Sequence, residues 1–208
     1  IRDTFAVSVY EAHGRLAILN KDLSGFNQCQ GRLSALYAAL PETGTENMPE
    51  FLAYRILYCI LLDAQAEALE GAMAEIYKRG LSRHSADVEV AVATQKYVLF
   101  GNHARLFRVY EEFSGRAIRD TTRTLVDEIM AKYRDAALRN VMKVLIGTTT
   151  DERLTKMLGF KAPEEYREFI GRYSPVYNSA GSIDTKLTFA NILKVPPPKV
   201  QVLYTVVQ

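Results

Sequence analysis

The sequence has few of the residues that usually carry metal or redox chemistry. It holds 2 cysteines and 3 histidines in 208 residues. The histidines, His13, His84 and His103, lie far apart with no carboxylate or cysteine at metal-ligand spacing, so we expect core or surface roles for them. Cys29 and Cys59 both fall within apolar helical patterns. This placement favours buried, reduced thiols over a disulfide or a redox pair.

Patterns typical of enzymes and of membrane proteins are missing as well. Gly147–Thr150 lacks the preceding strand and the lysine of a phosphate-binding loop. The acid pairs Glu111-Glu112 and Glu164-Glu165 are sequence neighbours, so their side chains point to different sides of a helix and do not form an acid/base pair. The longest apolar run, Ile56–Leu62, is far shorter than the ~20 residues that a bilayer requires. We therefore predict no catalysis, no cofactor, no small-molecule substrate and no membrane contact.

The overall charge is nearly balanced but unevenly distributed. Residues 1–100 hold nine Lys/Arg and twelve Asp/Glu, a net −3, whereas residues 101–208 hold seventeen and twelve, a net +5. The basic half is the expected place for an anionic partner. With 48% hydrophobic and 24% charged residues the composition is typical of a soluble globular protein. The start at Ile1–Thr4 carries no initiator methionine and no signal-peptide pattern, which favours a fragment.

The first 40 residues show two successive helical patterns separated by the polar Asn20-Lys21-Asp22. The first apolar stripe consists of Phe5, Val9, Ala12, Leu16 and Leu19. The second consists of Phe26, Cys29, Leu33, Leu36 and Leu40. Spacings of three and four predict helices, and the short connection predicts a helical hairpin. Two helices cannot bury two stripes alone, so the hairpin must stack on others.

Four further helices are predicted before residue 120. Residues 49–62 are apolar nearly all round, as in a central helix. Amphipathic patterns follow at 69–77, 85–99 and 103–113. Three hairpins of roughly 30 to 40 residues fall in the size range of tetratricopeptide repeats. The sequence thus predicts a mainly α protein in which residues 1–120 form a right-handed solenoid of helical hairpins.

Residues 121–193 have a different pattern. A long helix is predicted over 121–146. Two short helices are predicted after it, over 150–158 and 163–173, and two short helices joined this closely are typical of a helix-turn-helix. Residues 175–177, a turn at 178–181 and strict alternation over 183–189 predict a strand, a turn and a strand. A helix-turn-helix followed by a small β-hairpin is a winged helix. Residues 194–208 are expected to form an extended, proline-rich tail, whose segment Val200–Val207 would pair with the edge of the wing or with a partner.

A helical stack that runs into a winged helix is the layout of PCI domains, and four blocks resemble the signature blocks of the SAC/GANP family within that group. The blocks are Val9–Ala17, Asp22–Gln30, Glu50–Tyr58 and Ser182–Leu187. The resemblance covers roughly residues 1–189 in order, and FNQCQ and FLAYRILY are its most specific parts. The blocks resemble most the branch that contains leukocyte receptor cluster member eight and a yeast counterpart.

The resemblance implies a non-catalytic scaffold in nuclear messenger RNA biogenesis, in transcription-coupled processing, splicing or export. Members of the family pair with a second PCI-domain subunit through their winged helices. The pair often includes a small acidic protein shared with the proteasome lid, and it forms a joint surface that binds RNA or other single-stranded nucleic acid. The resemblance therefore implies three kinds of partner: a PCI subunit, a small acidic protein and RNA.

The candidate RNA-binding residues are basic side chains of the second half. Lys132, Arg139 and Lys143 share one sector of the long helix, because steps of seven and four residues nearly return to the same side. The others are Lys156, Lys161 and Lys186. The second helix of the helix-turn-helix carries a net −1, so sequence-specific groove recognition is not expected. A sequence-tolerant contact with the RNA backbone is the favoured interpretation, and a merely solvated basic face is the alternative.

Two other functions are compatible with the sequence. The chain could be a PCI subunit of a proteasome-lid, signalosome or translation-initiation assembly that contacts no nucleic acid. It could also be a free-standing helical repeat that binds peptides. The last interpretation requires a concave groove lined by polar and aromatic side chains, and we expect the helices here to be too apolar on all sides to form one.

Overall fold

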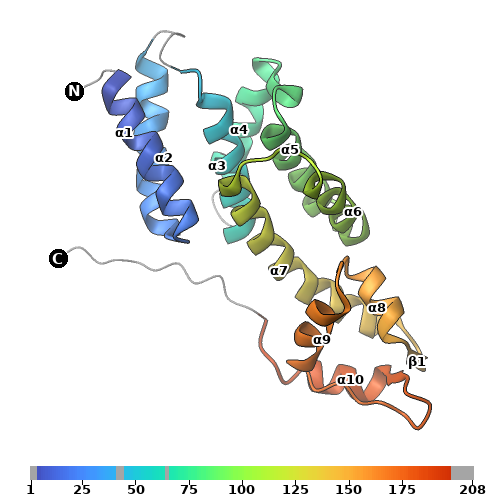
Figure 1. Ribbon diagram of the computed structural model, residues 1–208. Coiled ribbons are helices and arrows are strands. Elements are labelled where there is room, and N and C mark those ends of the chain that lie inside the picture. The colour runs from blue at the N-terminus through green and yellow to red at the C-terminus, as the bar shows by residue number, and fades with distance from the viewer. Residues whose placement is uncertain (1–3, 41–44, 64–65, 198–208) are drawn as a thin grey trace, which may run out of the picture.

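The computed structural model describes residues 4–40, 45–63 and 66–197. Its described part is mainly helical, with ten α-helices and one two-stranded antiparallel sheet. Figure 1 shows two regions: α1 to α6 at one end, α8 to α10 at the other, and the long helix α7 running between them. The segment Val200–Val207, predicted to pair with the wing, lies outside the described residues.

Six helices of the first region follow one another as three pairs. The pairs are α1 (Thr4–Leu19) with α2 (Leu23–Ala39), α3 (Met48–Leu62) with α4 (Ala66–Lys78), and α5 (Ala86–Leu99) with α6 (His103–Ser114). Side-chain caps start several of them, because Asp22, Ser85 and Asn102 each accept a hydrogen bond from the amide three residues on. The predicted hairpins are therefore present. The handedness of their stack stays a prediction.

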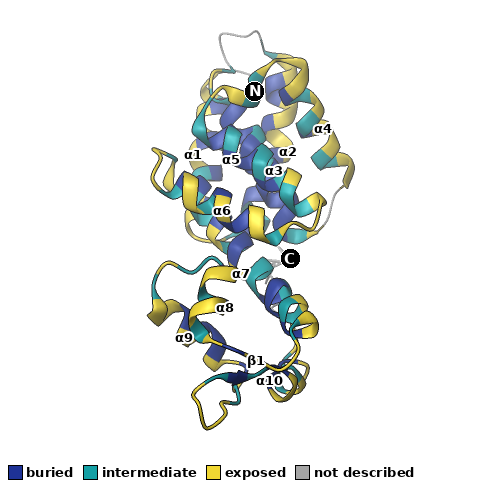
Figure 2. Cartoon of the chain, turned by 90° about the vertical axis from the view of Figure 1, so that its right-hand side faces the viewer, coloured by how far each residue is buried: buried dark blue, intermediate teal, exposed yellow. Residues whose placement is uncertain are grey.

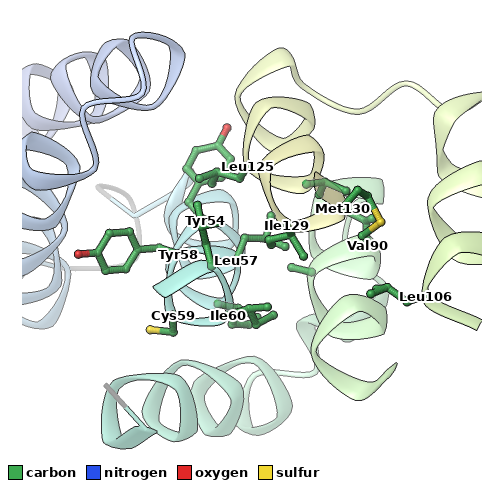
Figure 3. Close-up of a cluster of buried hydrophobic side chains, with 14 of the residues drawn as sticks. Tyr54, Leu57, Tyr58, Cys59, Ile60, Val90, Leu106, Leu125, Ile129 and Met130 are labelled. Carbon is green, nitrogen blue, oxygen red and sulfur yellow. The ribbon is translucent and has the colours of Figure 1, made fainter. Parts of the chain in front are cut away.

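Helix α3 lies at the centre of the first region. It packs against α4, α5 and α7, and nearly all of its side chains are buried (Figures 2 and 3). The aromatic rings of Phe26 and Tyr58 meet edge to face with centroids 5.5 Å apart, which joins α2 to this core. The prediction of a central helix at 49–62 is confirmed, and so is the burial of both thiols, since Cys29 and Cys59 are 2% exposed and free.

The predicted buried stripe of α1 is wrong. Phe5 and Leu16 are 72% and 58% exposed, and Val9, Ala12 and Leu19 are exposed as well. The buried side of α1 consists instead of Val7, Glu11, Gly14, Ala17 and Ile18.

Two contacts explain why α1 is turned this way. A Cβ at Gly14 would lie 3.1 Å from Cε1 of Phe51, so the absence of a side chain allows close packing. The Glu11 carboxylate accepts hydrogen bonds from the Tyr37 hydroxyl and the Asn47 amide, both at 2.7 Å. A buried glutamate with two donors is tolerated, and a hydrophobicity pattern does not anticipate it.

Helix α7 (Asp120–Val144) packs against α1, α3 and α6 on one side and against α10 (Thr185–Ile192) on the other. Two polar contacts support this position. Lys21, between α1 and α2, pairs with Glu128 at 2.6 Å, and the Tyr173 hydroxyl, just after α9, donates to Asp135 at 2.5 Å. The division into domains at residue 120 stays a prediction, and α7 contributes to both sides of it.

The C-terminal region contains α8 (Asp151–Met157), α9 (Pro163–Gly171) and α10. Its sheet pairs β1 (Thr148–Thr149) with β2 (Ile183–Asp184), two strands separated by both short helices. The predicted hairpin is present as a single bridge between Tyr177 and Ile183, across a turn in which the Asn178 side chain accepts from the amides of Ala180 and Ser182.

The predicted strand over 183–189 is wrong beyond Asp184. Residues 185–192 form α10, capped by the Asp184 carboxylate, which accepts from the Leu187 amide at 2.9 Å. The alternation over 183–189 coincides with a helical period, because Thr185, Thr188 and Ile192 are the buried residues of α10. An N-cap aspartate outweighs a short β-like pattern here.

Candidate nucleic-acid interface

The short helices α8 and α9 form a compact pair because each has a defined start and end. The Thr150 side chain accepts from the Arg153 amide and begins α8. Gly159 ends it with φ +65°, and a Cβ there would lie 2.5 Å from Cβ of Phe107. Pro163 then occupies the first turn of α9. The two predicted short helices are thus present, and their arrangement as the helix-turn-helix of a winged helix stays a prediction.

The pair is held by a buried aromatic cluster. Tyr166, Phe169, Ile170 and Tyr173 are buried as predicted. The Tyr166 hydroxyl donates to Asp151 at 2.9 Å, and the ring of Phe160 packs against both Tyr166 and Phe169. Burial is the main cause that raises the pKa of Tyr166, and its hydrogen bond to Asp151 adds to that effect. These contacts make a rigid base for the charged side chains around it.

The structure divides the six predicted RNA-contacting cations into two groups. Lys132 belongs to the first, since its ammonium donates to the carbonyls of Ile60 at 3.2 Å and Leu61 at 2.8 Å and pairs with Asp63 at 2.6 Å. Only 19% of its side chain is exposed. Lys132 therefore neutralises the C-terminal end of α3, where free carbonyls carry partial negative charge.

Arg139 is in the same group. Its guanidinium donates to both oxygens of Asp135 and to the carbonyls of Ile192 at 3.1 Å and Val195 at 2.8 Å. The hydrogen bond to Asp135 raises the pKa of Arg139. Arg139 therefore anchors the end of α10 to α7, and its donors are engaged within the protein.

The second group consists of exposed side chains. Lys143, Lys156, Lys161 and Lys186 are all exposed. Lys156 pairs with Glu152 at 2.8 Å, yet both side chains are at least three-quarters exposed. The Lys161 ammonium lies 5.5 Å from the centre of the Tyr110 ring. Lys143 and Lys186 have no ion pair within the described ranges. These four cations are available to an anionic partner.

A backbone contact joins the segment that follows Lys143 to the residue that precedes Lys186. The Thr185 amide and hydroxyl both donate to the Gly147 carbonyl, at 3.1 and 2.9 Å. This contact brings the start of α10 to the segment that follows α7. The two segments that carry these lysines, 43 positions apart in the sequence, therefore meet at Gly147 and Thr185.

Acidic residues dominate the outer side of α9. Glu164, Glu165 and Glu168 are exposed, and Arg167 approaches Glu164 only to 3.8 Å. This side would repel a phosphate backbone. Any contact with RNA is therefore directed to the lysines of α7, α8, the α8–α9 turn and α10.

Two arginines near this region were not among the predicted residues. The Arg134 guanidinium donates to the carbonyls of Leu158 and Gly159, at 3.2 and 2.8 Å, and lies 4.2 Å from the centre of the Phe160 ring. Burial lowers its pKa. Arg153 on α8 is exposed. Arg153 lies in the first turn of α8, three residues after the capping Thr150, and this position in the sequence was the signal that could have placed it on the surface.

Among the described residues, no group of three or more His, Cys, Asp or Glu side chains could hold a metal ion. His13 and His84 are exposed, while His103 lies beside Phe107 and Tyr133, where burial lowers its pKa. Every helix among the residues that the structure describes is too short or too polar to cross a bilayer.

Comparisons with known proteins identify relatives over most of the chain. The model of the SAC3/GANP family matches residues 16–178. The chain is 33% identical over 195 residues to the leukocyte receptor cluster member 8 homolog of Xenopus laevis. This alignment covers 91% of this chain and 23% of that protein. It is 31% identical over 183 residues to the THP3 homolog of Schizosaccharomyces pombe, covering 86% of this chain and 42% of that protein.

A plant relative gives the same assignment. SAC3 family protein A of Arabidopsis thaliana is 29% identical over 165 residues, covering 77% of this chain and 15% of that protein. The chain therefore spans less than half the length of each of these relatives. The match of the family model to most of the chain, together with relatives above 30% identity, shows that the chain belongs to the SAC3/GANP family.

Proposed function

We propose that this chain is a non-catalytic scaffold in nuclear messenger RNA biogenesis. Its winged-helix region, residues 121–193, pairs with a second PCI-domain subunit and contacts RNA, and a small acidic protein of the proteasome-lid type completes the assembly. The observation that carries this proposal is the exposure of Lys143, Lys156, Lys161 and Lys186 in the C-terminal part of a chain of the SAC3/GANP family.

The RNA contact in this proposal is electrostatic and tolerant of sequence. Lys143, Lys156, Lys161 and Lys186 supply exposed positive charge, while Lys132 and Arg139 mainly hold α7 to α3 and α10. Binding to phosphates releases counterions, so affinity falls as salt rises. The acidic side of α9 keeps RNA on the other side of the region.

Pairing with a second subunit needs exposed apolar surface near the winged helix. Val144 and Ile146, at the end of α7 and just before β1, are 76% and 97% exposed, and Leu187 in the first turn of α10 is exposed as well. The hydrogen bond from Thr185 to Gly147 keeps these segments together. Exposed apolar residues of this kind mark protein interfaces. Their position next to Lys143 and Lys186 would place RNA beside the partner.

The RNA contact is tested by fluorescence anisotropy with a labelled single-stranded oligo-uridine RNA, with the chain alone and with its partner subunit. The Lys143→Glu, Lys186→Glu double variant is expected to bind at least tenfold more weakly. The slope of the logarithm of its association constant against the logarithm of the salt concentration should also be shallower. The slope should change by roughly 0.7 for each phosphate that the variant no longer neutralises. The control is Lys78→Glu with Lys96→Glu, which makes the same charge change on exposed lysines of α4 and α5.

A subunit of a proteasome-lid, signalosome or translation-initiation assembly without nucleic-acid contact is the second candidate, favoured by the acidic side of α9. That function predicts no salt-dependent RNA binding, either alone or with the partner. Equal weakening of RNA binding in both double variants would indicate a response to net charge, and would contradict the proposed site.

A further inference from the structure

A groove lies in the first region, away from the lysines. It has a volume of about 360 Å³ and is bounded by α2, α3 and α4. In Figure 1 α3 stands between α2 and α4. Apolar and aromatic side chains line much of it, among them Leu33, Tyr37, Phe51 and Leu52. The expectation that these helices are too apolar to form a groove with polar and aromatic lining is therefore wrong.

Two buried polar atoms of residues that line the groove have no partner among the described residues. Oε1 of Gln30, on α2, accepts no hydrogen bond, and the residue is only 6% exposed. Nε of Arg55, on α3, is buried and donates none. The other end of each side chain is held, since the Gln30 amide donates to Asn27 at 2.7 Å and Nη1 of Arg55 donates to Ser34 at 3.5 Å.

Unpaired buried polar atoms are costly and uncommon in folded proteins. Here one is an acceptor and the other a donor, and both residues line the same open groove. A ligand that offers an N–H and a C=O would satisfy both. The peptide unit offers this pair of groups in an extended chain, whereas a helix uses its backbone groups internally.

The remaining walls indicate the side chains of such a peptide. The volume is at the lower end of the ~300–1,000 Å³ typical of ligand sites, so it suits a few residues of extended chain. The apolar walls fit an aliphatic side chain. At the α4 side Glu75 is paired with Arg79, while Glu67 has no ion pair within the described ranges. A free carboxylate at the rim favours a basic residue.

We propose that this groove binds an extended peptide segment of a partner protein, in which an aliphatic side chain lies next to a lysine or arginine. Gln30 accepts from a backbone N–H of the peptide, and Arg55 donates to a backbone C=O. This site is separate from the proposed RNA contact and does not depend on it.

The test begins with selection of a phage-displayed random heptapeptide library on the immobilised chain. Enriched peptides are then synthesised with a fluorescein label, and their dissociation constants are measured by anisotropy. We expect an aliphatic residue beside a basic one among the enriched sequences. Gln30→Met and Arg55→Met should each weaken binding at least tenfold, and Glu67→Gln should weaken it less.

Stability measurements separate a ligand-binding role from a structural one. Gln30→Met and Arg55→Met each remove one unpaired buried atom and one hydrogen bond, to Asn27 and to Ser34 respectively. These two effects oppose each other, so the urea midpoint of each variant should stay close to that of the parent. Gln28→Met and Arg32→Met are matched controls, because both residues are exposed on α2 and neither lines the groove. The controls should leave peptide binding unchanged.

Three results would overturn the proposal. The library could enrich no peptide, the selected peptides could bind the parent and both methionine variants equally, or they could bind as helices by circular dichroism. Binding by peptides that carry acidic residues alone would contradict the role of Glu67.

Discussion

The carboxylate of Glu50 connects three helices through hydrogen bonds. Arg15 on α1 donates to both of its oxygens, at 2.7 and 2.9 Å, and the Tyr54 hydroxyl donates at 2.7 Å. Tyr54 also bonds Thr121 on α7, and Arg119 approaches Glu50 to 3.5 Å. Three residues of the family blocks, Arg15, Glu50 and Tyr54, thus hold the first region together.

The same network makes stability depend on acid. Burial alone would raise the pKa of Glu50, but the hydrogen bonds from Arg15 and Tyr54 hold it below its ordinary value. The folded-state pKa therefore lies below the unfolded-state value of about 4.3. Stabilisation by this carboxylate is complete above that pH and is lost as pH falls through the folded-state pKa.

Glu50→Gln is expected to lower the free energy of unfolding at pH 7 by about 1–3 kcal/mol, because two arginines lose a charged acceptor. Between pH 5 and pH 3 the variant should lose less further stability than the parent. Urea unfolding monitored by circular dichroism across this pH range measures both effects. Glu46→Gln, at an exposed position, serves as the control. If the free energy of unfolding fell equally with pH in the parent and in Glu50→Gln, the Glu50 carboxylate would not be the source of the acid sensitivity.

Gly159 combines a left-handed backbone with close contact to Phe107. Gly159→Ala should lower the free energy of unfolding by about 2–3 kcal/mol, since the new Cβ meets both strain and a steric clash. Gly181→Ala isolates the backbone contribution, because Gly181 has φ +73° and no heavy atom lies within 4 Å of the place that a Cβ would take. Its cost should be about 1 kcal/mol. Thermal unfolding of both variants compares them, and equal losses would rule out the clash.

At the scale of elements, α1 shows how a helix can present its apolar stripe to solvent. Its packed side relies on the absence of a side chain at Gly14 and on the bonded carboxylate of Glu11. Helix α2 behaves differently, because its predicted stripe of Phe26, Cys29 and Leu33 is buried. Hydrophobic periodicity located both helices, but it oriented only the second correctly.

The orientation of α1 has a direct test. Replacing the exposed Phe5 and Leu16 together with serine should change the free energy of unfolding by less than about 0.5 kcal/mol for each substitution. Ile18→Ala, at a position that is 1% exposed, should cost about 2–5 kcal/mol. Urea unfolding of this chain compares them. A loss in the double serine variant as large as that in Ile18→Ala would mean that the stripe is buried after all.

At the scale of the whole molecule, α7 connects the two regions through side chains predicted to contact RNA. Lys132 holds the carbonyls at the end of α3, and Arg139 holds those at the end of α10. The position of the exposed lysines relative to the first region therefore depends on both. A charge reversal at either site would disturb the fold as well as any RNA contact.

This dependence separates Arg139, which supports the fold, from Lys143, which lies on the surface. Arg139→Met should lower the free energy of unfolding by about 1–3 kcal/mol, because Asp135 is buried and is left without its cationic partner. Lys143→Met should change it by less than about 0.5 kcal/mol, since Lys143 is exposed. Hydrogen exchange is expected to accelerate in α10 for Arg139→Met only. Unchanged exchange in α10 would show that Arg139 does not anchor it.

Local sequence patterns were sufficient to predict the mainly helical content, the paired helices, the central place of α3 and the short helix pair α8–α9. Each of these features follows from periodicity and from residues at helix starts such as Thr150 and Pro163, which act within a few positions. The family blocks are also local, because each lies within one short segment of the chain.

Tertiary packing alone determined which side of α1 is buried and which of the six cations remain exposed. It also brought Gln30 and Arg55 to one groove. These outcomes depend on partners far away in the sequence, such as Phe51 for Gly14 and Ile60 for Lys132. The local sequence around a charged residue or an apolar stripe is the same whether the side chains contact solvent, a carbonyl or a neighbouring helix. Only the packing of distant segments determines which of these contacts forms.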